Sequence, residues 1–149
     1  MRRRRLAVSA RPRARITVRK PRRSPIASVA TDVLIIGGGP AGLSAAIELG
    51  KLGVATLIVD DKDRLGGKLV LHTHKFFGSV EDSYAGTRGF EIGNILAAEI
   101  AKYPSVQVRL NTTAVAVFAD RVVGLVQGAR YVAVSPAKLM VATGDSKKM

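Results

Sequence analysis

Residues 32–60 constrain the fold of this 149-residue chain more than any other stretch. Residues 33–36 form a short aliphatic run, which is typical of a parallel strand buried on both faces. The sequence Gly-Gly-Gly-Pro-Ala-Gly follows at 37–42, and residues 43–52 then carry apolar side chains at helical spacing. A second aliphatic run, 54–59, is followed by an acidic residue. The stretch therefore predicts a strand, a glycine-rich turn, a helix and a second strand.

The three spaced glycines of this turn each have a physical role. Gly37 lets the chain turn tightly out of the strand, and Gly39 lets a pyrophosphate approach the backbone N–H groups. Gly42 allows the helix to lie against the strand. Pro40 and Ala41 begin the helix, where proline is tolerated and where the free N–H groups and the helix dipole attract phosphate. The pattern predicts a dinucleotide site.

An acidic residue completes the pattern. Asp60 lies 18 residues after Gly42, at the end of the second strand, where its carboxylate can accept a hydrogen bond from a ribose hydroxyl. Asp60 and Asp61 together would repel a 2′-phosphate, so we expect NADP to be disfavoured at this site. The spacing alone leaves NAD and FAD open, and a glycine-rich turn without a nucleotide is the structural alternative.

Three segments carry a family resemblance: residues 32–60, Arg-Leu-Gly-Gly-Lys at 64–68 and Ala-Thr-Gly at 142–144. Together they resemble the FAD-binding half of the pyridine nucleotide-disulfide oxidoreductases, in particular the thioredoxin-reductase-like members. The resemblance implies FAD as the cofactor and makes NAD less favoured at this site. It places five further positions near FAD: Gly66 and Gly67 beside the pyrophosphate and ribityl, Thr143 and Gly144 near the flavin, and Val115 near the adenine. Lys68, directly after the glycine pair, is a candidate for a contact with phosphate, and a solvated lysine is the alternative.

The rest of the chain fits an α/β domain. Residues 90–103 have helical spacing and end at a proline, and residues 106–110 alternate as a third strand. Three β-rich runs, at 114–118, 121–126 and 129–134, predict an antiparallel meander, and residues 138–142 predict a last strand. The predicted fold is a Rossmann-like FAD-binding domain with a central parallel sheet and an inserted antiparallel β-meander.

The resemblance also implies a function. We expect the FAD-binding portion of an FAD-dependent oxidoreductase that transfers hydride or electrons, with a pyridine nucleotide bound by a missing domain or a partner chain. A non-catalytic module that binds FAD or NAD is the alternative. Because such proteins continue beyond the Ala-Thr-Gly segment, we expect an incomplete domain, of marginal stability or self-associating into a homo-oligomer. No catalytic residue is assigned.

The charge of the chain lies mostly at its N-terminus. Of the 24 basic residues, 11 lie in residues 1–31, which contain no acid, whereas residues 32–149 hold 13 basic and 11 acidic residues. We therefore divide the chain into a basic disordered tail or linker, 1–31, and a domain, 32–149. An organelle-targeting segment and an arm that contacts nucleic acid or anionic lipid remain open, although the tail has no aromatic residue for base stacking.

Two histidines are the remaining candidates for chemistry. His72 and His74 alternate along the chain, but no third ligand is suitably spaced and cysteine is absent, so we expect no metal site. Following the resemblance, His72, His74 or Lys75 is a candidate for a hydrogen bond to the flavin ring. No apolar run is long enough to span a bilayer as a helix, and we expect a soluble, cytoplasmic protein.

Overall fold

The computed structural model describes residues 27–73, 75 and 84–144. Two α-helices, one 3₁₀ helix (η1) and six strands follow one another along this part of the chain. Their bounds are β1 (Ala27–Ile36), α1 (Pro40–Lys51), β2 (Thr56–Val59), η1 (Gly67–Leu71), α3 (Gly89–Ile100), β3 (Val106–Arg109), β4 (Thr112–Val117), β5 (Val123–Gln127) and β6 (Arg130–Val141).

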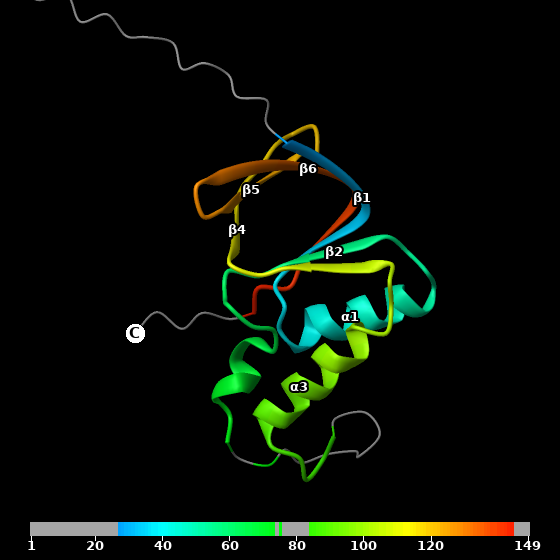
Figure 1. Cartoon of the computed structure of the whole chain (residues 1–149), viewed down its shortest axis with the longest axis vertical. Coiled ribbons are helices and arrows are strands. Elements are labelled where there is room, and N and C mark those ends of the chain that lie inside the picture. Colours follow the sequence, from blue (N-terminus) through cyan, green and yellow to red (C-terminus); the bar gives the residue numbers. More distant parts are fainter. Residues whose placement is uncertain (1–26, 74, 76–83, 145–149) are drawn as a thin grey trace, which may run out of the picture.

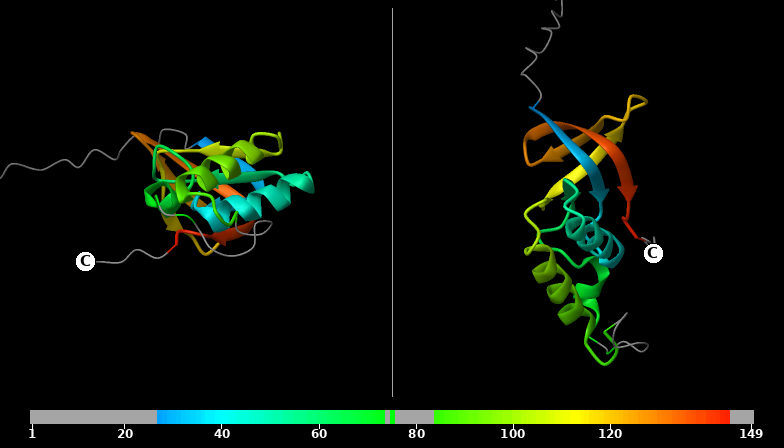
Figure 2. Two further views of the ribbon diagram at one scale, coloured as in Figure 1. Left: turned by 90° about the horizontal axis from the view of Figure 1, so that it is seen from below. Right: turned by 90° about the vertical axis from the view of Figure 1, so that its right-hand side faces the viewer.

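The described strands form one sheet in the order β3-β2-β1-β6-β5-β4. Strands β3, β2, β1 and β6 are parallel neighbours, whereas β5 pairs antiparallel with both β6 and β4. Helices α1 and α3 lie together on one side of the parallel strands, and the antiparallel part curves over the other side (Figures 1 and 2). The predicted α/β class, the central parallel sheet and the antiparallel meander are confirmed.

The two faces of the sheet bury separate sets of apolar side chains, because successive residues of a strand point to opposite faces. Leu34 and Ile35, adjacent in β1, are both fully buried but lie in different sets. The helix-side core consists of Ile35, Leu43, Ala46, Ile47, Ile58, Leu69, Ile92, Leu96 and Ile100. The meander-side core consists of Leu34, Leu57, Val59, Val123, Leu125 and Val134. Burial on both faces explains why residues 33–36 of β1 and 57–59 of β2 are continuously apolar.

Strand β6 differs from the prediction. The sequence suggested separate strands at 129–134 and 138–142, but the structure has one continuous strand of 12 residues. Its first part pairs with β5 up to Val134, and the strand also pairs with β1 along most of its length. Pro136 lies between the two expected strands. The pairing of β6 with β5 stops at Val134, so the missing N–H of Pro136 interrupts no pairing with β5.

The first strand also differs in its extent. Strand β1 begins at Ala27, five residues before the boundary that charge and composition suggested at residue 32. Residues 27–31 pair with residues 132–136 of β6, so this part of the expected tail belongs to the sheet. The pairing depends on a strand about a hundred residues away, which the local composition of 27–31 does not reveal.

None of the described helices combines the length and the apolar character that a membrane crossing requires.

Candidate functional site

The glycine-rich turn lies at the carboxyl end of the parallel strands, between β1 and α1 (Figure 1). Gly37 has a φ of +113°, and its N–H donates to the Val59 carbonyl at 2.8 Å. A Cβ on Gly37 would collide with the carbonyl oxygen of Ala142. The backbone direction and the proximity of the 142–144 segment therefore both require glycine here.

The other two spaced glycines differ in their surroundings. A Cβ on Gly42 would collide with the Gly37 carbonyl oxygen and lie 3.3 Å from Ile35, so glycine lets α1 sit directly against the end of β1. Gly39, the residue before α1, has an ordinary φ of −78°, and a Cβ there would meet nothing within 4 Å. Neither strain nor internal packing explains this glycine, whereas the close approach of a ligand would.

The first turn of α1 has no side-chain cap. Pro40 occupies the start of the helix, as predicted, and both Pro40 and Ala41 are exposed. The first N–H groups of a helix have no partner within the helix and carry the positive end of its dipole. The end of α1 beside Gly39 is therefore suited to an anionic group.

The second glycine pair lies directly beside this turn. The Gly66 N–H donates to the Gly38 carbonyl at 2.8 Å, and a Cβ on Gly67 would lie 2.9 Å from the Cα of Gly39. Gly66 and Gly67 have φ angles of +110° and +53°, which favour glycine. Segments separated by more than twenty residues are thus in backbone contact.

The Ala-Thr-Gly segment is the third part of the cluster. The Ala142 N–H donates to the Ile36 carbonyl at 2.7 Å, which holds residue 142 beside Gly37. Thr143 and Gly144 follow it and are exposed. The structure therefore brings together three of the segments that the sequence singled out.

Asp60 lies at the end of β2 with only 8% of its surface exposed. Its Oδ2 accepts a hydrogen bond from the Gly38 N–H at 2.6 Å, and its Oδ1 accepts one from the Lys62 N–H at 2.9 Å. The predicted contact of Asp60 with a ribose is untested, but the position is as expected. Each carboxylate oxygen keeps further acceptor capacity for a ligand hydroxyl.

The other predicted residues lie outside these contacts. Val115 is 53% exposed on edge strand β4, at an irregularity where it has no partner in the pairing with β5. Lys68 is exposed on η1, and His72 is partly buried just after η1. Lys75 forms an isolated bridge with Arg88. His74 lies outside the described residues.

The loop after Asp60 carries four consecutive charged side chains. Lys62 pairs with Asp61 at 2.7 Å, and this hydrogen bond raises the pKa of Lys62 above its ordinary value. Asp63 and Arg64 form a second exposed pair at 3.6 Å. Across residues 27–73, 75 and 84–144, no three His, Asp or Glu side chains gather in a way that could hold a metal ion.

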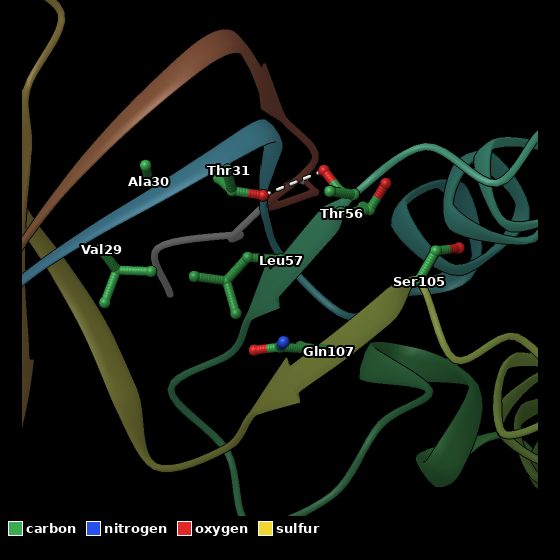
Figure 3. Close-up of a pocket in the computed structure, with 8 residues that line it drawn as sticks. Val29, Ala30, Thr31, Thr56, Leu57, Ser105 and Gln107 are labelled. Atoms are coloured by element: carbon green, nitrogen blue, oxygen red, sulfur yellow. Dashed lines mark hydrogen bonds between the residues drawn. The ribbon is translucent and has the colours of Figure 1, made fainter.

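A small hollow of about 100 Å³ lies elsewhere, beside the first half of β1 and the beginning of β2 and β3 (Figure 3). Val29, Thr31, Leu57 and Gln107 line it, and the Thr31 hydroxyl donates to the Ala55 carbonyl at 2.9 Å. Pockets that bind small-molecule ligands measure about 300–1,000 Å³. The hollow is too small for a dinucleotide.

The sequence reading assigned no role to Gly38 or Leu65, although both belong to the site. Gly38 is buried and hydrogen-bonds through its N–H and its carbonyl, and Leu65 packs against it. The visible signal was a fourth glycine, at a position where the G-x-G-x-x-G pattern accepts any residue.

Residues 31–149 match the family described as pyridine nucleotide-disulphide oxidoreductase. The chain is 34% identical over 113 residues to hydrogen cyanide synthase subunit HcnB of Pseudomonas protegens, covering 74% of this chain and 24% of that protein. It is 48% identical over 50 residues to a ferredoxin–NADP reductase of Paraburkholderia xenovorans, covering 34% and 14%. The L-proline dehydrogenase of P. horikoshii superposes with a TM-score of 0.70 at 27% identity, covering 81% of this chain and 24% of that one. The chain thus spans a quarter or less of the length of these relatives.

Proposed function

The chain belongs to the pyridine nucleotide-disulphide oxidoreductase family, and from this premise we propose that it is the FAD-binding portion of an FAD-dependent oxidoreductase. The family match confirms the resemblance that the sequence motifs suggested. The observation that carries the proposal is the convergence of three backbone segments, around Gly39, Gly67 and Ala142, beside the uncapped start of α1.

The described residues around the turn are of the kinds that a dinucleotide site needs. The N–H groups at the start of α1 would bind the pyrophosphate, and the open space at Gly39 would admit it. Gly66 and Gly67, whose backbone contacts the glycine-rich turn, would lie beside the pyrophosphate, and the Asp60 carboxylate would accept a hydrogen bond from the adenosine ribose. When bound, FAD supplies hydride or electron transfer through its isoalloxazine ring.

FAD is favoured over NADP at this site by charge. Asp60 and Asp61 are adjacent acidic residues at the end of β2, and a 2′-phosphate on the adenosine ribose would lie near both. FAD has no phosphate at that position. We place the pyridine nucleotide, as electron donor or acceptor, on another domain or on a partner chain.

The variant Gly39→Ala tests the proposal. Because the new Cβ would meet nothing within 4 Å and φ is −78°, the ligand-free protein should keep its melting temperature. The Cβ would instead enter the space proposed for the pyrophosphate, so the Kd for FAD should rise about tenfold or more. FAD binding is measured by quenching of flavin fluorescence and by the thermal shift on adding FAD.

The matched control is Ser44→Ala, an exposed position on the same helix, which should change neither quantity. Equal FAD affinity for Gly39→Ala and the wild type would contradict the proposed site. Stabilisation by NAD and not by FAD would replace the FAD proposal with that of a module that binds a different dinucleotide.

A further inference from the structure

The backbone of Gly38 forms hydrogen bonds with both ends of the loop that follows β2. Its N–H donates to Asp60 Oδ2 at 2.6 Å, and its carbonyl accepts from the Gly66 N–H at 2.8 Å. Asp60 and Gly66 are the two ends of the loop 60–66. Both ends of this loop are therefore attached to the same residue of the glycine-rich turn.

Neighbouring atoms of the protein itself account for glycine at position 38. A Cβ there would lie 2.5 Å from Leu65 Cδ2 and 3.1 Å from Asp60 Oδ2, both of which belong to the same loop. Gly39 is the opposite case, because a Cβ on it would meet no atom of the chain within 4 Å. Adjacent glycines of one turn thus face different surroundings, the loop in one case and open space in the other.

The loop is also supported from outside. The Lys62 carbonyl accepts a hydrogen bond from the Asn111 N–H at 2.8 Å. A Cβ on Gly66 would lie 3.4 Å from the Cα of Gly93 in α3, so the glycine pair is backed by that helix. Leu65 Cδ2 is the far end of a flexible side chain, but Leu65 also packs against the helix-side core, and Asp60 Oδ2 is held by its hydrogen bond from the Gly38 N–H. A side chain at residue 38 would therefore disturb the packing of Leu65 and crowd Asp60.

We propose that Gly38 is a positioning residue that sets the distance between the loop 60–66 and the glycine-rich turn. The packing of Leu65 on the bare Cα and the two hydrogen bonds hold Gly66 and Gly67 facing Gly39 before any ligand binds. The consequence for FAD affinity rests on the proposed function, whereas the position of the loop does not.

A double-mutant cycle in the full chain tests this role. Gly38→Ala should raise the Kd for FAD about tenfold in the wild-type background, because the Cβ displaces Leu65 and the glycine pair with it. In the Leu65→Ala background, where the space is open, the same substitution should raise the Kd less than about threefold. An equal penalty in both backgrounds would overturn the proposal and indicate a direct collision with the ligand. Gly39→Ala, whose Cβ is clear of Leu65, is the control that Leu65→Ala should not rescue.

A second measurement needs no cofactor. Lys62 and Arg64 are exposed in the loop, so trypsin cleavage after them reports how firmly the loop is held. Gly38→Ala should speed this cleavage, identified by mass spectrometry, several-fold in the wild-type background and little in the Leu65→Ala background. Unchanged cleavage in the wild-type background would overturn the positioning role. If cleavage behaves as expected but no variant binds FAD, the proposed function fails and the positioning role stands.

Discussion

The glycines of this chain allow the cost of a backbone angle to be separated from the cost of a collision. Gly37 carries both costs, since its φ is +113° and a Cβ would strike the Ala142 carbonyl. The strained angle costs an alanine about 1–3 kcal/mol. The collision costs about 1–3 kcal/mol more, because the 2.7 Å hydrogen bond from the Ala142 N–H to Ile36 holds that carbonyl in place. Gly37→Ala should therefore lower the free energy of unfolding by about 2–6 kcal/mol.

Two matched variants isolate the components. Gly53 has a φ of +69° with nothing within 4 Å of its Cβ position. Gly53→Ala should therefore lower the free energy of unfolding only through the strained backbone angle, by about 1–2 kcal/mol. Gly39 has neither problem. The gain of about 0.4–1 kcal/mol that alanine brings through the unfolded state is offset by the loss of glycine at the N-cap of α1, so Gly39→Ala should leave stability nearly unchanged. The three costs should rank in the order 37, 53, 39.

The assay is urea unfolding of the ligand-free chain, followed by far-UV circular dichroism. With an m value of about 1–3 kcal/mol/M, a loss of several kcal/mol moves the midpoint by more than about 1 M. Since domains of this kind are stable by about 5–15 kcal/mol in total, Gly37→Ala can also leave the domain largely unfolded without urea. Equal midpoints for Gly37→Ala and Gly53→Ala would refute the collision, and with it the close contact between the turn and the 142–144 segment.

Two further predictions concern the meander-side core and the ionisation of Glu99. Leu125 is 1% exposed in the meander-side core, so Leu125→Ala should lower the free energy of unfolding, measured in urea titrations, by about 2–5 kcal/mol. Leu139 is 37% exposed, so Leu139→Ala should lower it clearly less. Equal losses would mean that the meander does not pack on the sheet as described. Hydrogen bonds from Lys102 and Tyr103 lower the pKa of Glu99 below its ordinary value, so its stabilisation is present above that value and lost as the pH falls through the lowered pKa. Glu99→Gln should therefore lower the Tm slightly at about pH 6 and leave it equal to wild type at about pH 2, and a Tm difference that persists at low pH would exclude this ionisation as the cause.

The sequence predicted most of the elements because their signals are local. The apolar run at 33–36, the glycine spacing from Gly37 to Gly42 and the proline after α3 each depend on residues within a few positions of one another. The two expected helices, the second strand and the third strand appear with shifts of a few residues at their ends. The motifs also identified the family, which the match over residues 31–149 confirms.

The errors arose where a long-range pairing outweighs the local signal. Residues 27–31 carry the composition of a tail but gain a partner strand at 132–136, and residues 130–141 form one strand across Pro136. Neither pairing has a signature within its own segment, because a strand is stabilised by its neighbours in the sheet.

The sequence by itself determined the order of the elements and the residue types that a dinucleotide site requires. Only the tertiary structure showed what Gly38 contacts and which atoms a side chain at each glycine would meet. A Cβ would meet Ala142 at Gly37, Leu65 and Asp60 at Gly38, and open space at Gly39, although the three residues are identical and consecutive. The requirement for glycine at each position comes from atoms that are distant along the chain, or from their absence, and folding alone sets those distances.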